Sequence, residues 1–311
     1  MEKVLVIGGA GYIGSMLVAH LLLRNYKVTV VDNLLYGQRT LFQHVSNPNF
    51  NFVFGDARDE TLIAEQIKKH DAIIPLAALV GAKVCDMDPI MTRTLNLDSI
   101  LLLNKLRSTE QKLVWPCTNS GYGTKTGEIF CTEETPMEPI TLYGETKVKA
   151  EQALLDKGNA ISLRLATVFG ASPRMRIDLL VNDFVYRAFT DRFLVIFEKD
   201  FKRNYVHIDD VCDAFCFCLE HFVDMKGEAY NVGLNDANLS KAELAEKIKQ
   251  YIPKFYIHYA EVGSDPDKRN YIVSNEKIKK KGFEASHSLD EGIQQLITTY
   301  QMFPRGRFAN V

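Results

Sequence analysis

The stretch KVLVIGGAGYIGSMLVAHLLL, residues 3–23, decides the fold of this chain. It opens with an apolar, β-branched run typical of a strand and closes with the apolar spacing of a helix. Between the two stand Gly8, Gly11 and Gly14. Residues without a Cβ permit a tight turn, and they let the phosphates of a ligand approach the backbone N–H groups at the start of the helix. The stretch therefore predicts a strand–turn–helix unit that binds a dinucleotide.

An acidic residue ends the next predicted strand. The run KVTVVD, residues 27–32, finishes at Asp32, which lies 18 residues beyond Gly14. A carboxylate at this place can accept hydrogen bonds from the ribose hydroxyls of NAD, and it would repel the 2′-phosphate of NADP. Asp32 therefore indicates NAD as the cofactor.

Strands and helices alternate through the first half of the chain. Apolar strands are predicted at 3–8, 27–32, 49–56, 71–78, 112–118 and 160–166. Helices are predicted at 14–24, 60–69, 89–106 and from 143 onward. Continuous apolar strands that alternate with helices favour a parallel sheet covered on both faces. The fold class is therefore α/β, with a doubly wound parallel (Rossmann) sheet.

The second half does not continue the regular strand–helix alternation of the first half, and it predicts a smaller α/β lobe that binds the substrate. We place the NAD-binding domain at 1–168 and this lobe at 169–311, with some segments rejoining the sheet, such as a strand at 228–233. A helix that follows RNYVHIDDV is expected to be capped by Asp209 or Asp210. Further helices are predicted at 239–251, where Ser240 is the expected cap, at 274–286 and at 288–300.

The composition excludes several classes of protein. The 311 residues carry a net charge of −2, so neither nucleic acid nor an acidic membrane is an expected partner. No run reaches the roughly 20 apolar residues of a membrane span, and the N-terminus does not resemble a signal peptide. The six cysteines form no C-x-x-C pair, so we expect reduced thiols and a cytoplasmic protein.

The segment TLYGETKVKAE, residues 141–151, places Tyr143 and Lys147 four residues apart. On a helix these side chains share one face, about 6 Å apart along the axis. A phenol is a poor base near neutrality, but a neighbouring ammonium favours the phenolate and lowers the pKa of the phenol. An ordinary amphipathic helix would show the same spacing, so the pair alone leaves both readings open. Thr118, which ends the fifth predicted strand 25 residues before Tyr143, stands at the edge of the sheet where such folds bind ligands.

Eight segments together resemble the extended short-chain dehydrogenases/reductases, in particular the nucleotide-sugar epimerases and dehydratases. They are GGAGYIGS, VVDN, GDARD, LAAL, CTNSGYG, YGETKVKAE, RLATVFG and RNYVHIDDV, and they span nearly the whole chain. In that family the Tyr of Y-x-x-x-K is the general acid and base, the Lys holds the nicotinamide ribose, and a Ser or Thr assists at the substrate hydroxyl. The resemblance assigns these roles to Tyr143, Lys147 and Thr118.

The resemblance also implies a set of cofactor contacts. It places Asp56 near the adenine, residues 76–78 along the cofactor and Asn96 behind the active site. The full expected cofactor set is Gly8, Gly11, Tyr12, Ile13, Gly14, Asp32, Asn33, Asp56, Ala57, Leu76, Ala77, Ala78, Asn96 and Lys147.

The expected substrate contacts follow partly from the resemblance and partly from the basic residues of the second half. Arg203 and Arg269 match recurrent phosphate-binding arginines of the family, and the guanidinium fork of Arg174 and Arg176 also suits phosphate oxygens. Many relatives carry Asn where this chain has Thr167. The full expected substrate set is Asn119, Ser120, Thr167, Arg174, Arg176, Asn182, Arg203 and Arg269.

The implied activity is oxidation of the C4 hydroxyl of a nucleotide sugar by NAD. The 4,6-dehydratases carry Asp-Glu directly after the Thr, whereas this chain has Asn119 and Ser120, which are poor acids and bases near neutrality. Elimination of water is therefore disfavoured. The chain is most similar to a subgroup that handles surface-polysaccharide sugars and includes GDP-heptose 4-dehydrogenases, so a 4-dehydrogenase acting on a GDP-sugar is the leading expectation and a 4-epimerase the alternative.

Three further expectations complete the sequence-based picture. A non-catalytic NAD-binding sensor is disfavoured because Tyr143, Lys147 and Thr118 are all present. The segment HIDD, residues 207–210, is expected to cap a helix and not to bind a metal, so no metal is predicted. The family implies a homodimer or a higher homo-oligomer that pairs through the helices near 89–106 and 143–157.

Overall fold

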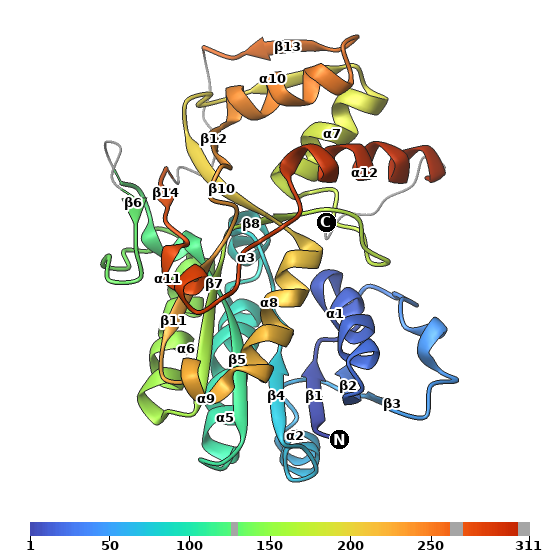
Figure 1. The fold of residues 1–311 in the computed structure, drawn as a ribbon, viewed down its shortest axis with the longest axis vertical. Coiled ribbons are helices and arrows are strands. Elements are labelled where there is room, and N and C mark those ends of the chain that lie inside the picture. Colours follow the sequence, from blue (N-terminus) through green and yellow to red (C-terminus); the bar gives the residue numbers. More distant parts are fainter. Residues whose placement is uncertain (126–129, 262–269, 304–311) are drawn as a thin grey trace.

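A seven-stranded parallel sheet forms the centre of the molecule (Figure 1). The computed structural model describes residues 1–125, 130–261 and 270–303. The strands lie in the order β11-β7-β5-β4-β1-β2-β3, and every neighbouring pair is parallel. Their bounds are β1 Lys3–Ile7, β2 Lys27–Asp32, β3 Phe50–Phe54, β4 Ala72–Pro75, β5 Lys112–Thr118, β7 Ala160–Leu165 and β11 Ala229–Val232. The six strands predicted in the first half and the strand that rejoins the sheet are confirmed.

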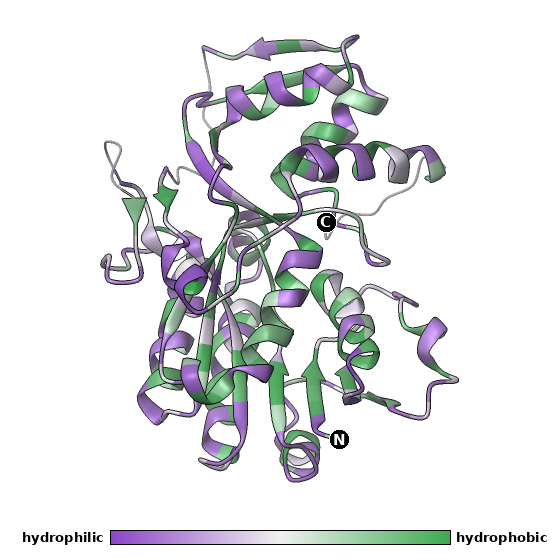
Figure 2. Cartoon of the chain, viewed as in Figure 1, coloured by the Kyte–Doolittle hydropathy of each residue, from purple (hydrophilic) through white to green (hydrophobic). Residues whose placement is uncertain are grey.

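The strand side chains explain why helices cover both faces of this sheet. Val4 and Val6 of β1 belong to one buried apolar cluster, and Leu5 and Ile7 belong to another on the opposite face, because successive side chains of a strand point to opposite sides. Hydrophobic residues concentrate along the strands and polar residues on the outer helix surfaces (Figure 2). The near-continuous apolar runs of the sequence therefore follow from burial on both faces.

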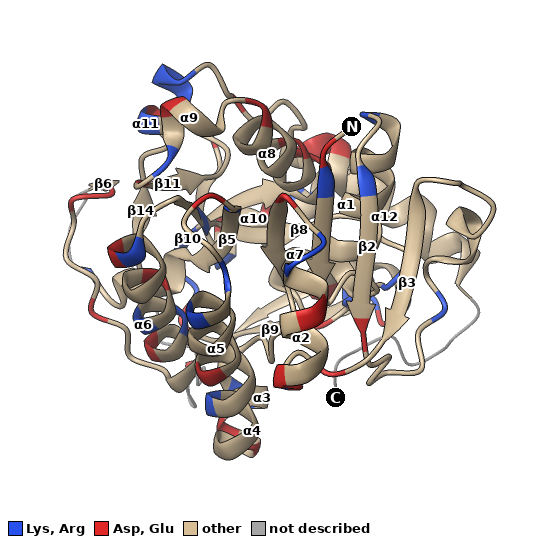
Figure 3. Ribbon diagram, turned by 90° about the horizontal axis from the view of Figure 1, so that it is seen from below, with Lys and Arg blue, Asp and Glu red and all other residues tan. Residues whose placement is uncertain are grey.

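The helices divide between the two faces. The cluster that holds Val4 and Val6 is completed by α1 Tyr12–Leu23, α8 Ile208–Glu220, α9 Phe222–Met225 and α11 Glu276–Lys280. The opposite cluster is completed by α2 Glu60–Ile67, α5 Ser99–Leu106 and α6 Leu142–Lys157. In the view from below, basic and acidic residues alternate on α6, whereas the charged residues of α2 are acidic and the one charged residue of α5 is Lys105 (Figure 3).

One predicted helix has an unforeseen turn. The segment 89–106 forms α4 Pro89–Arg93, a π-helical turn η2 Thr94–Asp98 and then α5. A π-turn adds one residue to a helix and is frequent at functional sites. Asn96 lies in this turn, and the short α3 Ala82–Met87, which the sequence did not predict, precedes it.

A smaller lobe stands beyond the carboxyl ends of the strands. It contains α7 Leu180–Thr190, α10 Lys241–Tyr251 and α12 Leu289–Met302, packed around an apolar cluster of their own. A three-stranded sheet is formed by β8 Thr167–Phe169, β10 Lys202–His207 and β12 Asn238–Ser240. Two short parallel pairs complete it: β9 Phe193–Ile196 with β13 Tyr256–Tyr259, and β6 Phe130–Cys131 with β14 Ile272–Val273. The boundary at 168/169 remains a prediction, since α8, β11 and α11 return to the large sheet.

The helix caps confirm one expectation and correct another. Ser240 caps α10 in a capping box with Glu243, as expected. The predicted cap of α8 is wrong: the N-cap is His207, whose ring accepts from the backbone N–H of Asp209. The helix predicted at 274–286 is shorter, because α11 ends at Lys280 and Gly282 follows with a φ of +103°. No helix in the described ranges is both long and apolar enough to cross a membrane.

Candidate active site

Two glycines of the glycine-rich corner have no room for a side chain. Gly8 has a φ of +85°, and a Cβ on it would lie 2.5 Å from the backbone nitrogen of Ala77. A Cβ on Gly14 would lie 2.6 Å from the Cα of Gly9. Helix α1 starts directly after Gly11 without a side-chain cap, so its first N–H groups face this corner. These residues therefore fit the pyrophosphate of a dinucleotide.

Asp32 links the glycine turn to the following loop. One carboxylate oxygen accepts from the backbone N–H of Ala10 at 2.9 Å, and the other accepts from Leu34 at 2.8 Å. Burial raises the pKa of Asp32 above its ordinary value, although both backbone hydrogen bonds oppose this. A carboxylate has about four acceptor positions, so Asp32 retains capacity for ribose hydroxyls.

The expected adenine side of the site is held by a polar pair. Asp56 forms an ion pair with Arg58 at 2.8 Å and accepts from the Asn33 amide at 3.1 Å. Hydrogen bonding from Arg58 lowers the pKa of Asp56 to about 2. Asn33 and Asp56 both belong to the expected cofactor set and follow two different strands, β2 and β3. The structure places their side chains in contact.

The loop after β4 is fixed from behind. The backbone N–H groups of Leu76 and Ala77 both donate to the carbonyl of Ile7. The Asn96 amide, fully buried in the π-turn, exchanges two hydrogen bonds of 2.8 Å with the backbone of Leu79. The Asn96 side chain thus holds this loop and does not face outward, and its expected place behind the active site remains a prediction.

Tyr143 and Lys147 stand on the first turns of α6, which Thr141 caps through the N–H of Gly144. Tyr143 packs against the cluster of Leu79 and neighbouring apolar residues. It therefore borders the same loop along which the cofactor is expected to run.

Lys147 is almost fully buried. Its side chain is 3% exposed, and Nζ lies 3.5 Å from the centroid of the Trp115 ring. Burial lowers the pKa of Lys147 to about 7. The ammonium is therefore poised to gain from any anion or hydroxyl acceptor that enters the site, a phenolate included.

Thr118 ends β5 at the carboxyl edge of the sheet, as predicted. Its hydroxyl donates to the Ser120 hydroxyl at 2.9 Å and accepts from the Ser120 backbone N–H at 3.1 Å. Asn119 between them is fully buried, and neither amide atom has a hydrogen-bond partner within the described part of the chain. Cys117 faces the core instead, as the alternation of the strand predicts.

The residues expected to bind substrate are distributed more widely. Arg176 is largely buried and paired with Asp178 at 2.6 Å. Asn182 is buried and holds the backbone of Gly170 and Arg176. Arg203 is 2% exposed, and its guanidinium lies 5.6 Å from the Tyr271 ring centroid.

The other substrate candidates are placed as follows. Thr167 opens β8, and its side chain is partly buried. Arg269 lies outside the described residues. The phosphate-binding roles of all these residues remain predictions.

Comparison with known proteins decides the family. The model of the NAD dependent epimerase/dehydratase family matches residues 4–233. The chain belongs to this family. The resemblance inferred from the eight sequence segments is thereby confirmed, and so is NAD as the cofactor of this enzyme.

Members of the family with curated names match along nearly the whole chain. The UDP-glucose 4-epimerase of Lactobacillus helveticus is 30% identical and covers 98% of each chain. The low-salt glycan biosynthesis protein Agl12 of Haloferax volcanii is 29% identical over 96% of this chain and 98% of its own.

Solved structures of the family have the same architecture. UDP-glucose 4-epimerase of Thermotoga maritima with UDP-glucose is 26% identical, with a TM-score of 0.84 over 96% of this chain and 98% of its own. The dTDP-glucose 4,6-dehydratase of Bacillus anthracis in complex with NAD is also 26% identical, with a TM-score of 0.84 and coverage of 97% of both chains. The chain is therefore an enzyme of the NAD-dependent nucleotide-sugar epimerases and dehydratases.

A cavity beside the helix that carries Tyr143 and Lys147 was not predicted from the sequence. A cavity of 430 Å³ lies between α3 and the start of α6, lined by Ala82, Lys83, Asp86, Met87, Ile140, Thr141 and Leu142. One of its lining residues, Leu142, directly precedes Tyr143 in the sequence. The signal in the sequence was faint, because α3 has only six residues and follows Gly81 with its positive φ of +104°.

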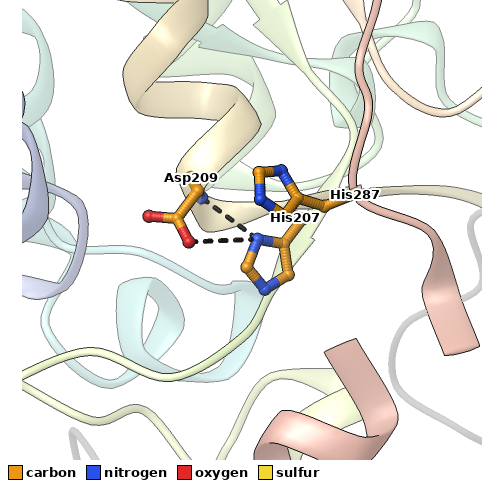
Figure 4. Close-up of side chains that lie close together, drawn as sticks. All are labelled: His207, Asp209 and His287. Atoms are coloured by element: carbon orange, nitrogen blue, oxygen red, sulfur yellow. Dashed lines mark hydrogen bonds and ion pairs between the residues drawn. The ribbon is translucent and has the colours of Figure 1, made fainter. Parts of the chain in front are cut away.

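A second polar cluster brings together side chains from the end of β10, the start of α8 and the segment before α12 (Figure 4). Within the described residues, His207, Asp209 and His287 form a group that could hold a metal ion. The two rings stack at 4.8 Å with an interplanar angle of 23°, so their in-plane lone pairs do not converge on one point. His207 already accepts the Asp209 N–H, and Asp210 accepts from His287 at 2.9 Å. The cluster is therefore better explained as a junction, and the expectation of no metal remains a prediction.

The same junction predicts a pH dependence of stability. His20 of α1 lies 3.3 Å from Asp209 and 3.0 Å from Asp213, and the hydrogen bond to Asp209 raises the pKa of His20. A raised histidine pKa stabilises the fold fully below the unfolded value of about 6.5, and this stabilisation is lost as the pH rises through the folded value. His20→Gln is expected to cost about 1 kcal/mol at pH 6 and less at pH 9.

Thermal unfolding of the variant at both pH values measures this difference. Exposed His258 of β13 offers a control, since His258→Gln should change stability equally little at either pH. A loss of stability at His20 that is as large at pH 9 as at pH 6 would contradict the ion pair.

Proposed function

We propose that this enzyme oxidises the C4 hydroxyl of a nucleotide sugar, with Tyr143 as the proton acceptor. The observation that carries the proposal is the placement of Tyr143 beside the loop after β4, on the helix whose next turn holds the buried Lys147. Thr118 ends the neighbouring strand at the same edge of the sheet. These residues provide a base, a cation that stabilises the base, and a hydroxyl beside it.

The chemistry of the chain's own residues follows from their surroundings. NAD, when bound, accepts the hydride from the C4 carbon of the sugar. Tyr143, as phenolate, takes the proton of the C4 hydroxyl, and the C–O bond becomes a carbonyl. Lys147 is the nearest buried cation along this helix and stabilises the phenolate. The Thr118 hydroxyl orients the same substrate oxygen by a hydrogen bond.

The dehydratase reaction is disfavoured. Elimination of water needs an acid and a base beside Thr118, and the chain places Asn119 and Ser120 there. A neutral amide and a hydroxyl coupled to Thr118 supply neither near neutrality. A 4-keto-6-deoxy product would contradict this step.

Two outcomes remain after C4 oxidation. The sequence favours net release of a 4-keto sugar, as in a 4-dehydrogenase acting on a GDP-linked heptose. The names of the relatives favour return of the hydride, because the relative from Lactobacillus helveticus is a UDP-glucose 4-epimerase at 30% identity. Both outcomes need the same first step and differ in whether NADH accumulates.

Incubation of the purified enzyme with UDP-glucose, GDP-mannose and a GDP-heptose distinguishes them. Proton NMR should show a C4 epimer with no net NADH, or a 4-keto sugar whose formation needs an external hydride acceptor. A panel in which none of the three sugars reacts would contradict the proposal.

The proposed location is the cytoplasm, which supplies nucleotide sugars and keeps thiols such as the six buried cysteines reduced.

We further propose that the enzyme is a homodimer that pairs through α4–α5 and α6. Ile90 is 78% exposed and Leu101 is 41% exposed on this helical surface. Exposed apolar side chains grouped on neighbouring helices mark interaction sites. Sedimentation should show a dimer, and Ile90→Asp combined with Leu101→Asp should yield a monomer. A wild-type monomer at micromolar concentration would contradict this.

A further inference from the structure

Residues 170–174, which follow β8, form a strap across the first turn of α1. The Ser172 hydroxyl donates to the backbone carbonyl of Tyr12 at 2.8 Å and lies 3.1 Å from the Ser15 hydroxyl. The buried Tyr12 hydroxyl donates to the carbonyl of Gly170 at 2.8 Å. Three hydrogen-bond contacts therefore attach the strap to the helix that opens the glycine-rich corner.

The strap starts from a rigid point. Gly170 has a φ of +121°, and a Cβ there would lie 2.8 Å from His207 Nε2. Its N–H donates to the Asn182 side chain at 3.1 Å. This end cannot shift without disturbing the buried packing of the smaller lobe, so movement of the strap is left to its far end.

The far end rests on the loop after β2. The Arg174 guanidinium lies 4.6 Å from the centroid of the Tyr36 ring, a cation–π contact, and Tyr36 is 42% exposed. The loop beneath is tied to the glycine turn, because Thr40 donates to the carbonyl of Ala10 at 3.0 Å. The strap thus connects the turn that fits a pyrophosphate to the loop that follows Asp32.

We propose that Arg174 and Tyr36 form a latch that keeps NAD in the site between turnovers. The two attachment points of the strap, on Tyr12 and on Tyr36, flank the positions expected to bind the pyrophosphate and the adenine ribose. Release of the cofactor then requires the Arg174–Tyr36 contact to open. The latch itself requires only that NAD binds. Its effect on the reaction rests on the proposed function, since a cofactor that stays bound favours return of the hydride to the same sugar.

We therefore assign Arg174 to the retention of the cofactor and not to the binding of the substrate. The sequence placed it with the phosphate-binding arginines, whereas in the structure its guanidinium contacts the Tyr36 ring and donates to the carbonyl of Met175. Tyr36 was not predicted as a site residue at all. Neither residue touches the reacting atoms, so we regard both as positioning residues.

The test measures exchange of the cofactor and needs no sugar. Purified enzyme loaded with isotopically labelled NAD+ is mixed with excess unlabelled NAD+, and the label that remains bound is followed over time. Tyr36→Ala and Arg174→Ala are expected to release NAD roughly fivefold faster than wild type. Tyr36→Phe keeps the ring and should release NAD at the wild-type rate. The double Ala variant should be no faster than either single variant, because the two residues act as one contact.

A matched control comes from a similar pair elsewhere. Arg192 lies just beyond the end of α7, and its guanidinium is 5.8 Å from the ring of Phe189 in that helix. Arg192→Ala should leave the rate of NAD exchange unchanged. Arg174→Gln and Tyr36→Leu repeat the test if an Ala variant folds poorly, which thermal unfolding shows.

Two results would overturn the latch. One is a wild-type exchange rate that the Tyr36 and Arg174 variants do not change. The other is Arg174→Ala raising the KM for a nucleotide sugar while NAD exchange stays at the wild-type rate, since that would make Arg174 a substrate ligand. If exchange behaves as expected and no nucleotide sugar reacts, the latch stands and the proposed function fails.

Discussion

Tyr143→Phe is expected to lower turnover about a thousandfold while NAD stays bound. The substitution removes only the hydroxyl, so the ring keeps its packing against Leu79, Cys85 and Leu95. The substitution removes the group proposed to take the C4 proton, and Lys147, the other proposed site residue of α6, lies buried against Trp115. Turnover and the amount of NAD released on denaturation are measured on the same preparation.

The result also separates an enzyme from a non-catalytic NAD-binding sensor. A sensor would show no turnover before the substitution, and the variant would then change nothing. Tyr251→Phe on α10 is a matched control that should leave turnover unchanged. A Tyr143→Phe variant that retains a tenth or more of wild-type turnover would contradict the role of this tyrosine.

Lys147→Met is expected to abolish turnover and, in the absence of NAD, to make the protein more stable at neutral pH. Burial lowers the pKa of Lys147 from 10.5 to about 7, which means that the fold disfavours the ammonium. Each unit of such a shift corresponds to about 1.4 kcal/mol. Methionine fills a similar volume without a charge, so stability should rise by several kcal/mol below pH 7.

The sign of the pH dependence follows from linkage. For a lysine whose folded pKa is lowered, the destabilisation is complete below the folded value of about 7 and disappears as the pH rises toward 10.5. The wild-type protein should therefore gain stability from this group between these two values, and the Met variant should not. Urea unfolding at pH 6, 8 and 10 measures the difference. A variant less stable than wild type at pH 6 would mean that the ammonium is well paired in the fold.

The sequence could predict the parts of the fold that depend on local patterns. The strand run before Gly8 and the glycine spacing predicted the first βα unit correctly, because both signals lie within one short stretch of the chain. Continuous apolar strands predicted burial on both faces. Thr118, Asp32 and the Tyr143–Lys147 helix followed from the same logic, since parallel strands end at one edge.

The parts that failed depend on contacts between distant residues. The pairs β6–β14 and β9–β13 join strands of two to four residues, too short to carry a periodic signal. His207 caps α8, while the Asp209 carboxylate contacts His20 of α1, and no local rule anticipates this arrangement. The contact of Arg174 with Tyr36 likewise joins the two halves of the chain.

The most direct test of the central claim mixes NAD-loaded enzyme with the nucleotide sugar found reactive in the panel and follows NADH absorbance in a single turnover. The wild type should show NADH within the first turnover, transient for an epimerase and lasting for a dehydrogenase. The Tyr143→Phe variant should show none on that time scale. NADH that forms equally fast in the variant would show that another group takes the C4 proton, and it would contradict the account.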